Sequence, residues 1–488
     1  MAEKFEANFD SLRAHTTPTW FRDAKFGIWS HWGPQSVPMY GDWYARNMYI
    51  EGSDQYRYHV RHYGHPSEFG YKDICALWHA EKFDPAELMA LYVKAGAKYF
   101  VSQAMHHDHF FNYASDINPM NSVQVGPHQD IVGRWRQEAK KYGLPFGVTE
   151  HLGASFSWWW VNKMHDTYGP YAGVPYDGND PKYRQFYHAD EKHIQDEPGK
   201  MAMWYTDDPA FRAYWLRCMK ELISRYTPDL LYTDGCLPFH EGWTNPGDPV
   251  REEDYLEGLE MVAYLYNRSA EEYGTNRAVY TQKDRNPNVY RVGTLDVEKS
   301  QLEGILADPW QTDTCIGNWF YDVRQVYKHP DQIIEMLIDI VSKNGTMLMN
   351  VLQKPDGTID AEARYILEEL ATWFPVLGEG IYETRPWKVF GEGETRVKIQ
   401  GFTEEKTAWA ASDIRYTHKD NTVYAFLMGG ARNHKTVLYS FDQGEEIRSV
   451  RLVGAGEVPF THSLGVLTVA LPDKMPTKYT NALAIELK

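Results

Sequence analysis

The first 350 residues of the chain alternate short apolar runs with longer amphipathic segments. In the stretch 228–235, the apolar run Leu230-Leu231-Tyr232 fits a strand buried on both faces of a parallel sheet. Residues 84–96 show the helical pattern, with Asp84 as N-cap, Pro85 at the first helical position and apolar residues spaced along one face. The same two patterns predict strands over 24–33, 98–107, 145–151, 228–235, 278–281, 293–298 and 345–351. They predict helices over 84–96, 130–142, 208–223, 255–273 and 330–343.

Strands that alternate with helices indicate a parallel sheet, and about eight such units favour a (β/α)8-like TIM barrel over an open sheet. No Gly-x-Gly-x-x-Gly follows the first strand, which argues against a dinucleotide-binding fold. Near residues 373–375 the pattern changes to short β-rich runs punctuated by Gly, Asn and Asp, at 397–400, 422–427 and 467–471. We therefore predict a catalytic barrel over 1–375 and a C-terminal all-β sandwich over 376–488.

Polar residues follow most of the predicted strands. The carboxyl ends of barrel strands meet at the mouth, where TIM-barrel enzymes place their chemistry. Asp234 is the main candidate, because it ends a buried strand and Gly235 lets the chain turn away from it. The residues that this rule gathers at the mouth are His31, His106, His107, Glu150, His151, Asp234 and Glu298, with Asp42, Trp43 and Tyr44 from the first loop.

Composition narrows the classes of partner. The formal charge of −17 argues against nucleic acid or an anionic membrane surface as partner, since phosphate binding requires a basic patch. No apolar run is long enough to span a bilayer. The four cysteines are scattered and suggest neither a disulfide framework nor a zinc site. Aromatic residues make up 15% of the chain, and their flat faces suit sugar rings as well as cores.

The cellular location and oligomeric state stay open. The chain begins without a visible secretion signal, but a mature protein restarted at Met would look the same. The protein would be periplasmic or secreted if a signal peptide was removed, and cytoplasmic otherwise. An oligomer is possible.

Two chemistries fit a mouth rich in acids, imidazoles and aromatic rings. A glycosidase needs two carboxyl groups that flank the glycosidic bond. A metal-dependent hydrolase needs His and Asp ligands, for which His106-His107-Asp108-His109 is the best candidate. Adjacent histidines on a strand point to opposite faces, so this pair favours no metal unless the strand has already ended. We expect neither a metal nor another cofactor.

Several motifs resemble glycoside hydrolase family 29, the α-L-fucosidases. The opening segment 24–33, preceded by Trp20-Phe21 and followed by Ser36-Val37-Pro38 and Trp43-Tyr44, is similar to the family's first signature. Further matches, in order, are Gly96-Ala97-Lys98-Tyr99, His106-His107-Asp108, Thr233-Asp234-Gly235, Asn344-Gly345-Thr346 and Pro355-Asp356-Gly357-Thr358. The resemblance covers nearly the whole chain and implies the same barrel and β-sandwich.

The resemblance implies a retaining exo-α-L-fucosidase that works by double displacement. Asp234 matches the family's nucleophile. The acid/base residue is poorly preserved in the family; we choose Glu298, which ends a predicted strand at the same mouth, and Glu303 as the second choice. The alternatives to a functional Glu298 are ion pairs with Lys299 or Arg291. Where relatives often have Trp-Glu, this chain has Trp310-Gln311, which removes a competing acid.

The resemblance also implies a substrate-binding set. His31, His106 and His107 would bind the fucose hydroxyls, and Trp43 or Trp319 would pack on the C5 methyl group. Asp42 stands where many relatives have Glu, which leaves the hydroxyl preference open. His151, Tyr205 and Arg291 are further candidates. The expected partner is a fucosylated oligosaccharide or glycoconjugate; an α-L-galactosidase, an enzyme on algal fucan oligosaccharides and an inactive fucose-binding protein are alternatives.

Overall fold

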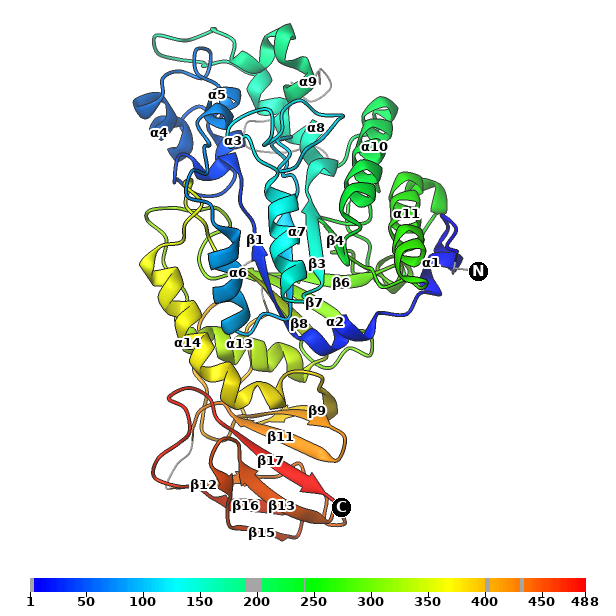
Figure 1. Cartoon of the computed structure of the whole chain (residues 1–488), viewed down its shortest axis with the longest axis vertical. Helices are drawn as coiled ribbons and strands as arrows, with labels where there is room; N and C mark the ends of the chain where they lie inside the picture. The colour runs from blue at the N-terminus through cyan, green and yellow to red at the C-terminus, as the bar shows by residue number, and fades with distance from the viewer. Residues whose placement is uncertain (1–3, 189–203, 241, 400–403, 431–433) are drawn as a thin grey trace.

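A computed structural model describes residues 4–188, 204–240, 242–399, 404–430 and 434–488. Eight parallel strands pair in sequence order and close into a barrel, which confirms the predicted fold (Figure 1). The strands are β1 (Phe26–Ser30), β2 (Tyr99–Gln103), β3 (Phe146–Glu150), β4 (Leu230–Thr233), β5 (Val279–Gln282), β6 (Thr294–Glu298), β7 (Trp310–Cys315) and β8 (Gly345–Asn350). The pattern of the sequence does not assign β7, because four consecutive polar residues, 311–314, form its centre.

Helices surround the barrel, and all the main ones except the last lie where the amphipathic segments predict them; the helix over 361–377 was not predicted. The main helices are α6 (Pro85–Lys94), α7 (Ile131–Lys141), α10 (Pro209–Tyr226), α11 (Leu256–Tyr273), α13 (Pro330–Ser342) and α14 (Ala361–Leu377). The connection after β5 has only the single turn α12 (Pro287–Tyr290), and residues 299–309, all described, join β6 to β7 without a helix. The predicted start of α6 is confirmed, because the Asp84 carboxylate accepts from the backbone N–H of Ala86 at 3.0 Å.

The barrel interior is filled by large side chains. Trp29, Tyr99, Leu230, Tyr232 and Leu348 belong to one buried cluster inside the ring of strands. The ring of Tyr99 fits because Gly27 faces it: a Cβ on Gly27 would lie 2.3 Å from that ring. The interior is therefore a packed core that supports the mouth above it.

Insertions build the rim of the mouth. Residues 31–84 follow β1 and contain α3 (Tyr44–Asn47), α4 (Asp54–His62) and α5 (Tyr71–Ala76). The insertion after β3 contains α8 (Ser155–Trp158) and α9 (Arg184–Tyr187); the part from 189 to 203 lies outside the described residues. Both insertions lie at the top of Figure 1, while α1 (Phe9–Arg13) and α2 (Thr19–Ala24) lead into β1. No helix among the described residues is long and apolar enough to cross a membrane.

The C-terminal region consists of two antiparallel sheets. One has the order β14-β13-β17-β11-β10-β9 and the other β12-β16-β15. Side chains from both sheets share one buried core, so the predicted β-sandwich is confirmed. The strands are β9 (Arg385–Glu392), β10 (Ile414–Lys419), β11 (Thr422–Leu427), β12 (Lys435–Leu438), β13 (Ile447–Leu452), β14 (Gly456–Glu457), β15 (Phe460–Ser463), β16 (Val466–Ala470) and β17 (Ala482–Leu487).

One predicted strand of this region is wrong. Residues 397–399 form no strand, and Gln400 lies outside the described residues. The edge of the larger sheet is instead β9. This strand contains Pro386, and its side chains are half-exposed or exposed, so its sequence shows no clear alternation of apolar and polar residues. The predicted runs 422–427 and 467–471 correspond to β11 and β16.

The sandwich is fixed to the barrel through α13 and α14, below which it lies in Figure 1. The buried carboxylate of Asp339 on α13 pairs with Lys343, the C-cap of that helix, at 2.6 Å and with Arg415 on β10. Trp373 on α14 donates from its indole N–H to the carbonyl of Thr480 at 2.8 Å. The change of pattern at 373–375 falls inside α14, which continues to Leu377, so the division at 375 stays a prediction.

Candidate active site

A cavity of 580 Å³ opens at the carboxyl ends of the barrel strands. Its size is in the range of small-molecule sites. Most of the predicted site residues line it, although they come from segments far apart in the chain. The predicted residues on its wall are His31, Asp42, Trp43, His106, His151, Tyr205, Asp234, Glu298 and Trp319.

Asp234 lies one residue beyond β4, where the backbone is held on both sides. Its N–H donates to the carbonyl of Glu150 at 3.2 Å, which continues the pairing with β3. Gly235 then adopts φ +103°, and a Cβ there would lie 2.7 Å from the indole nitrogen of Trp204. Only glycine fits this position without strain, so the turn that exposes the carboxylate depends on Gly235.

Three side chains hydrogen-bond to the Asp234 carboxylate. Lys283 donates to Oδ1 at 2.6 Å, the hydroxyl of Tyr232 donates to Oδ1 at 3.2 Å, and Nε2 of His107 lies 3.1 Å from Oδ2. Burial alone would raise the pKa of Asp234. The charge of Lys283 and the hydrogen bond from His107 outweigh burial and hold that pKa well below its ordinary value. Asp234 is therefore ionised and oriented.

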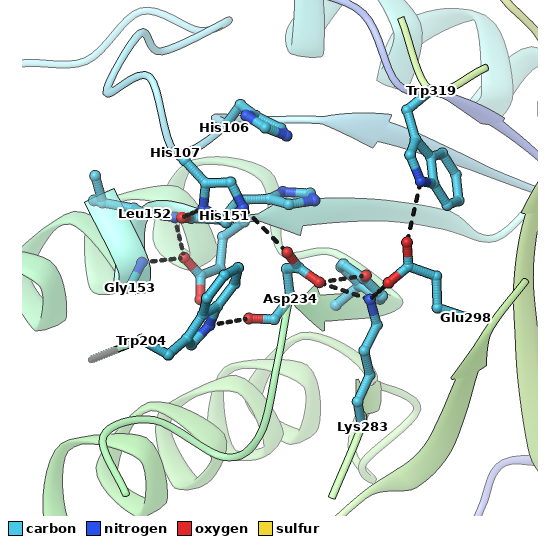
Figure 2. A network of polar contacts seen from close by, with 12 residues as sticks. His106, His107, His151, Leu152, Gly153, Trp204, Asp234, Lys283, Glu298 and Trp319 are labelled. Atoms are coloured by element: carbon cyan, nitrogen blue, oxygen red, sulfur yellow. Dashed lines mark hydrogen bonds and ion pairs between the residues drawn. The ribbon is translucent and has the colours of Figure 1, made fainter. Parts of the chain in front are cut away.

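Glu298 shares the same lysine. Its Oε2 lies 2.5 Å from the Lys283 ammonium, and its Oε1 accepts from the indole N–H of Trp319 at 3.1 Å (Figure 2). Because one nitrogen contacts both carboxylates, the nearest oxygens of Asp234 and Glu298 are at most about 5.1 Å apart, the sum of the two contact distances. Two carboxyl groups at this separation can act on opposite sides of one bond.

The environment of Glu298 favours its protonated form. Burial raises the pKa of Glu298 to about 7, Lys283 opposes this, and the charges of Asp313 and Asp234 add to it. The two carboxyl groups beside one lysine thus differ in protonation: Asp234 is a carboxylate, while Glu298 holds a proton near neutral pH. This difference is the one expected between a nucleophile and a general acid.

The histidine pair His106–His107 does not alternate as it would on a strand. β2 ends at Gln103, so both rings turn toward the mouth, with their centroids 4.5 Å apart. Nδ1 of His107 donates to the carbonyl of His151 at 2.7 Å, and its other nitrogen meets Asp234. His107 therefore positions the Asp234 carboxylate, while His106 lines the cavity.

His31, His106 and His151 form a buried imidazole cluster. Burial lowers the pKa of all three rings, that of His151 to about 3, so they are neutral at physiological pH. Three of their ring nitrogens have no hydrogen-bond partner within the described parts of the chain: both nitrogens of His31 and Nδ1 of His151. Buried polar atoms without partners are costly, which indicates that a polar ligand satisfies them.

The same three histidines are the residues that could hold a metal ion. Each offers a ring nitrogen, and these atoms lie within 4.8 Å of one another, as in no other group of the described residues. Gln35 donates to Nδ1 of His106 at 2.8 Å, which leaves the N–H at Nε2 of that neutral ring. An N–H at Nε2 suits a sugar hydroxyl oxygen and must be lost before that nitrogen can bind a metal.

The aromatic wall is held by its own contacts. The rings of Trp43 and Trp204 stack with centroids 6.4 Å apart, and Trp43 lies edge-on to His107. The hydroxyl of Tyr205 donates to the carbonyls of Asp234 at 3.3 Å and Cys236 at 2.8 Å, so it fixes the turn after Asp234. Burial raises the pKa of Asp42 to about 6, against a hydrogen bond from the Trp43 backbone that lowers it.

Three acids or bases named from the sequence are not brought to the cavity. Arg291 pairs with Asp308 at 2.9 Å on an exposed surface before β6, at the opposite end of that strand from Glu298. Glu303 is exposed in the connection to β7. Glu150 is buried, but it accepts from the N–H of Leu152 at 2.8 Å and so supports the turn after β3 (Figure 2).

Three residues that line the cavity were not predicted from the sequence: Lys283, Asp313 and Trp204. Lys283 could have been found by the rule that found Asp234, because it directly follows the strand β5. Asp313 belongs to β7, which has no continuous apolar run. Trp204 gave no signal beyond its place next to Tyr205.

Comparisons with known proteins identify the family of the chain. Residues 1–379 match the family profile described as Alpha-L-fucosidase, and residues 407–488 match the Alpha-L-fucosidase C-terminal domain. The tissue alpha-L-fucosidase of Rattus norvegicus is 27% identical over 494 residues, which cover 99% of this chain and 92% of that protein. The human tissue alpha-L-fucosidase is 26% identical over 438 residues, or 88% and 79% of the two chains.

Among solved structures, the alpha-fucosidase of Thermotoga maritima in complex with fucose superposes with a TM-score of 0.72 at 25% identity. That match covers 99% of this chain and 100% of the other. The barrel, the C-terminal sandwich and the sequence therefore lead to one conclusion. The chain belongs to the α-L-fucosidase family of glycoside hydrolases.

Proposed function

We propose that the protein is a retaining exo-α-L-fucosidase that removes terminal α-L-fucose from fucosylated oligosaccharides or glycoconjugates. The observation that carries the proposal is the pair Asp234 and Glu298, held by one lysine with their nearest oxygens at most about 5.1 Å apart. Retaining glycosidases place their carboxyl groups about 5–5.5 Å apart, whereas inverting enzymes leave room for a water. We assign this activity to the predicted domain of residues 1–375.

In the first step Asp234 is the nucleophile. Its ionised Oδ attacks the anomeric carbon of fucose, while Glu298 donates its proton to the departing glycosidic oxygen. The bond from the anomeric carbon to that oxygen breaks, and a covalent glycosyl-enzyme with an ester at Asp234 forms. His107 and Lys283 hold the attacking carboxylate in place.

In the second step Glu298 is the base. It takes a proton from water as the water oxygen attacks the anomeric carbon, and the electron pair of the ester bond returns to Asp234. Two inversions give net retention. The same residue serves as acid and then as base, which requires a pKa close to the working pH, and the pKa of Glu298 is about 7.

Recognition of fucose uses the imidazole cluster and the aromatic wall. The unpartnered nitrogens of His31 and His151 and the N–H of His106 can bind the sugar hydroxyls. Trp319 has its N–H engaged by Glu298, so it offers the cavity an apolar ring for the C5 methyl group. Trp43 is the second candidate for that contact. The solved Thermotoga relative is a complex with fucose, which supports this ligand.

The direct test is release of free fucose. We expect the protein to hydrolyse 4-nitrophenyl α-L-fucoside with the α-anomer of fucose formed first, as followed by proton NMR. The β-fucoside and the α-L-galactoside serve as comparison substrates. Initial formation of the β-anomer would contradict the retaining mechanism, and failure to release fucose from any α-L-fucoside would contradict the function.

The protonation states predict a pH profile for kcat/KM. Glu298 must be protonated in the free enzyme, so activity should fall as the pH rises through about 7. Asp234 must be ionised, and because its pKa lies well below its ordinary value, the acidic loss should occur only below about pH 4. Measurement with a substrate that has a poor leaving group checks this. A basic limb near pH 9 would show that another group is the acid.

A further inference from the structure

Lys283 occupies a position that the two-carboxylate mechanism does not by itself explain. It follows β5, its side chain is only 5% exposed, and its ammonium lies between Asp234 and Glu298 (Figure 2). The carboxylate of Asp313 is 3.8 Å from the same ammonium. Burial lowers the pKa of Lys283, but the surrounding acids, Asp234 above all, outweigh burial and hold that pKa well above its ordinary value, so the lysine stays charged.

The groups that face the three participants come from five strand ends. Glu298 faces Lys283, Asp313, Asp234 and the Trp319 indole. Asp234 faces Lys283, His107, His151 and Tyr232. Behind them, the buried Asp296 accepts from Gln311 at 2.6 Å and has a pKa raised well above its ordinary value by burial and by Asp313. Lys283 is therefore the cation through which the two reacting carboxyl groups interact.

The first chemical step removes the negative charge of Asp234, one of the two carboxyl groups that share Lys283. In the free enzyme the Asp234 carboxylate balances the ammonium, and its negative charge helps Glu298 to keep a proton. In the glycosyl-enzyme Asp234 is a neutral ester, so that repulsion disappears. The charge of Lys283, 2.5 Å from Glu298 Oε2 and 3.8 Å from Asp313, is then no longer shared with Asp234 and acts most strongly on Glu298.

We propose that Lys283 is a positioning residue that changes its main partner from Asp234 to Glu298 during the reaction, and so converts Glu298 from an acid into a base. This inference rests on the proposed function. When the ester forms, the proton of Glu298 leaves with the alcohol product, and Lys283 stabilises the carboxylate that remains. When water attacks, the proton moves from water to Glu298 and the electron pair returns to Asp234, which takes the lysine back.

The test removes the charge of Lys283 and measures the formation and the hydrolysis of the glycosyl-enzyme separately. Lys283→Met should slow the second step most, because Glu298 loses the cation that keeps it ionised. With 2-chloro-4-nitrophenyl α-L-fucoside, whose phenolate leaves without a proton, we expect kcat to fall by about 10²-fold and KM to fall with it. A rapid release approaching one phenolate per active site should then precede slow turnover, and mass spectrometry should show the fucosyl-enzyme.

Two further readouts follow from the protonation of Glu298. Raising the pH should restore the second step in Lys283→Met, with its midpoint about one or more pH units above that of wild type. Azide needs no base and should increase kcat of the variant as it forms fucosyl azide. Lys283→Arg keeps the cation and should show neither the initial release nor the response to azide.

The outcomes distinguish this proposal from a structural role and from the proposed function. If Lys283→Met lowers kcat and kcat/KM equally, with no initial release and no azide response, Lys283 only shapes the cavity and the proposal is wrong. Lys283→Gln, which keeps a hydrogen-bond donor without the charge, carries the same test if the Met variant does not fold. If wild type itself forms no fucosyl-enzyme with 2-fluoro-fucosyl fluoride, it is the proposed function that fails.

Discussion

Replacing Asp234 with glycine should lower hydrolysis of an aryl α-L-fucoside by at least about 10⁴-fold, the scale on which nucleophile removal acts in other hydrolases. The loss is large because the variant has no group that can form the glycosyl ester. Glycine also removes one anionic partner of Lys283 and His107, and it leaves space where the carboxylate was. The measurement is steady-state release of the aryl alcohol, with folding checked by circular dichroism.

Azide makes this result specific for the nucleophile. In Asp234→Gly, azide can enter the space that the carboxylate occupied and attack the anomeric carbon directly. This single displacement inverts the configuration, so the product should be β-fucosyl azide. Asp313→Gly is the matched control, because Asp313 is another buried carboxylate beside Lys283. It should lose activity without any response to azide. Turnover close to wild type in Asp234→Gly would remove this residue from the mechanism.

The sequence predicts the strand-end residues of this site well, for a physical reason. Parallel strands in a barrel present their carboxyl ends on one face, so a polar residue after an apolar run is placed at the mouth by topology alone. Asp234, His31 and Glu298 follow from that rule. Lys283 satisfies the rule too, but the apolar run before it is short, and lysine at a strand end resembles a solvated surface residue.

The residues that sequence patterns cannot place depend on connections without regular structure. Arg291 and Glu303 lie close in sequence to Glu298, yet neither reaches the cavity. Arg291 lies before β6, at the opposite end of that strand, and Glu303 is exposed in the loop that follows β6. Trp319 lies 21 residues beyond Glu298 and returns to donate to its carboxylate at 3.1 Å. No local periodicity specifies such a return. The motif resemblance named Trp319, whereas spacing alone did not.

The same limit applies to the C-terminal sandwich. β16 alternates between buried and less buried residues, because one of its faces meets the shared core of the sandwich. β11 is a nearly continuous β-rich run, because its two faces meet the core of the sandwich and the core of the barrel. β9 has no buried face, and its side chains are half-exposed or exposed along its whole length. Its place as an edge strand comes from pairing with β10, which is a long-range contact.

Glu298→Gln should give a loss that depends on the leaving group. Glutamine keeps the shape of glutamate and can accept from Trp319, but it has no acidic proton to give. Hydrolysis of a fucosylated oligosaccharide should fall by about 10²–10⁴-fold, the range of general acid catalysis. For the first step on 2-chloro-4-nitrophenyl α-L-fucoside, the change should stay within about tenfold, since that phenolate needs no protonation. Glu303→Gln, at an exposed position, is the matched control and should leave both rates unchanged.

Comparison of Glu298→Gln with Lys283→Met separates the acid/base residue from the residue that sets its charge. Both variants lack an effective base, so both should accumulate the fucosyl-enzyme with an activated substrate and respond to azide. Lys283→Met still has the carboxyl group of Glu298, which can ionise, so its second step should recover as the pH rises. Glu298→Gln lacks this group, so its second step should stay slow at every pH. An equal loss on glycan and aryl substrates in Glu298→Gln would show that Glu298 is not the acid, and recovery of that variant at high pH would show that another group is the base.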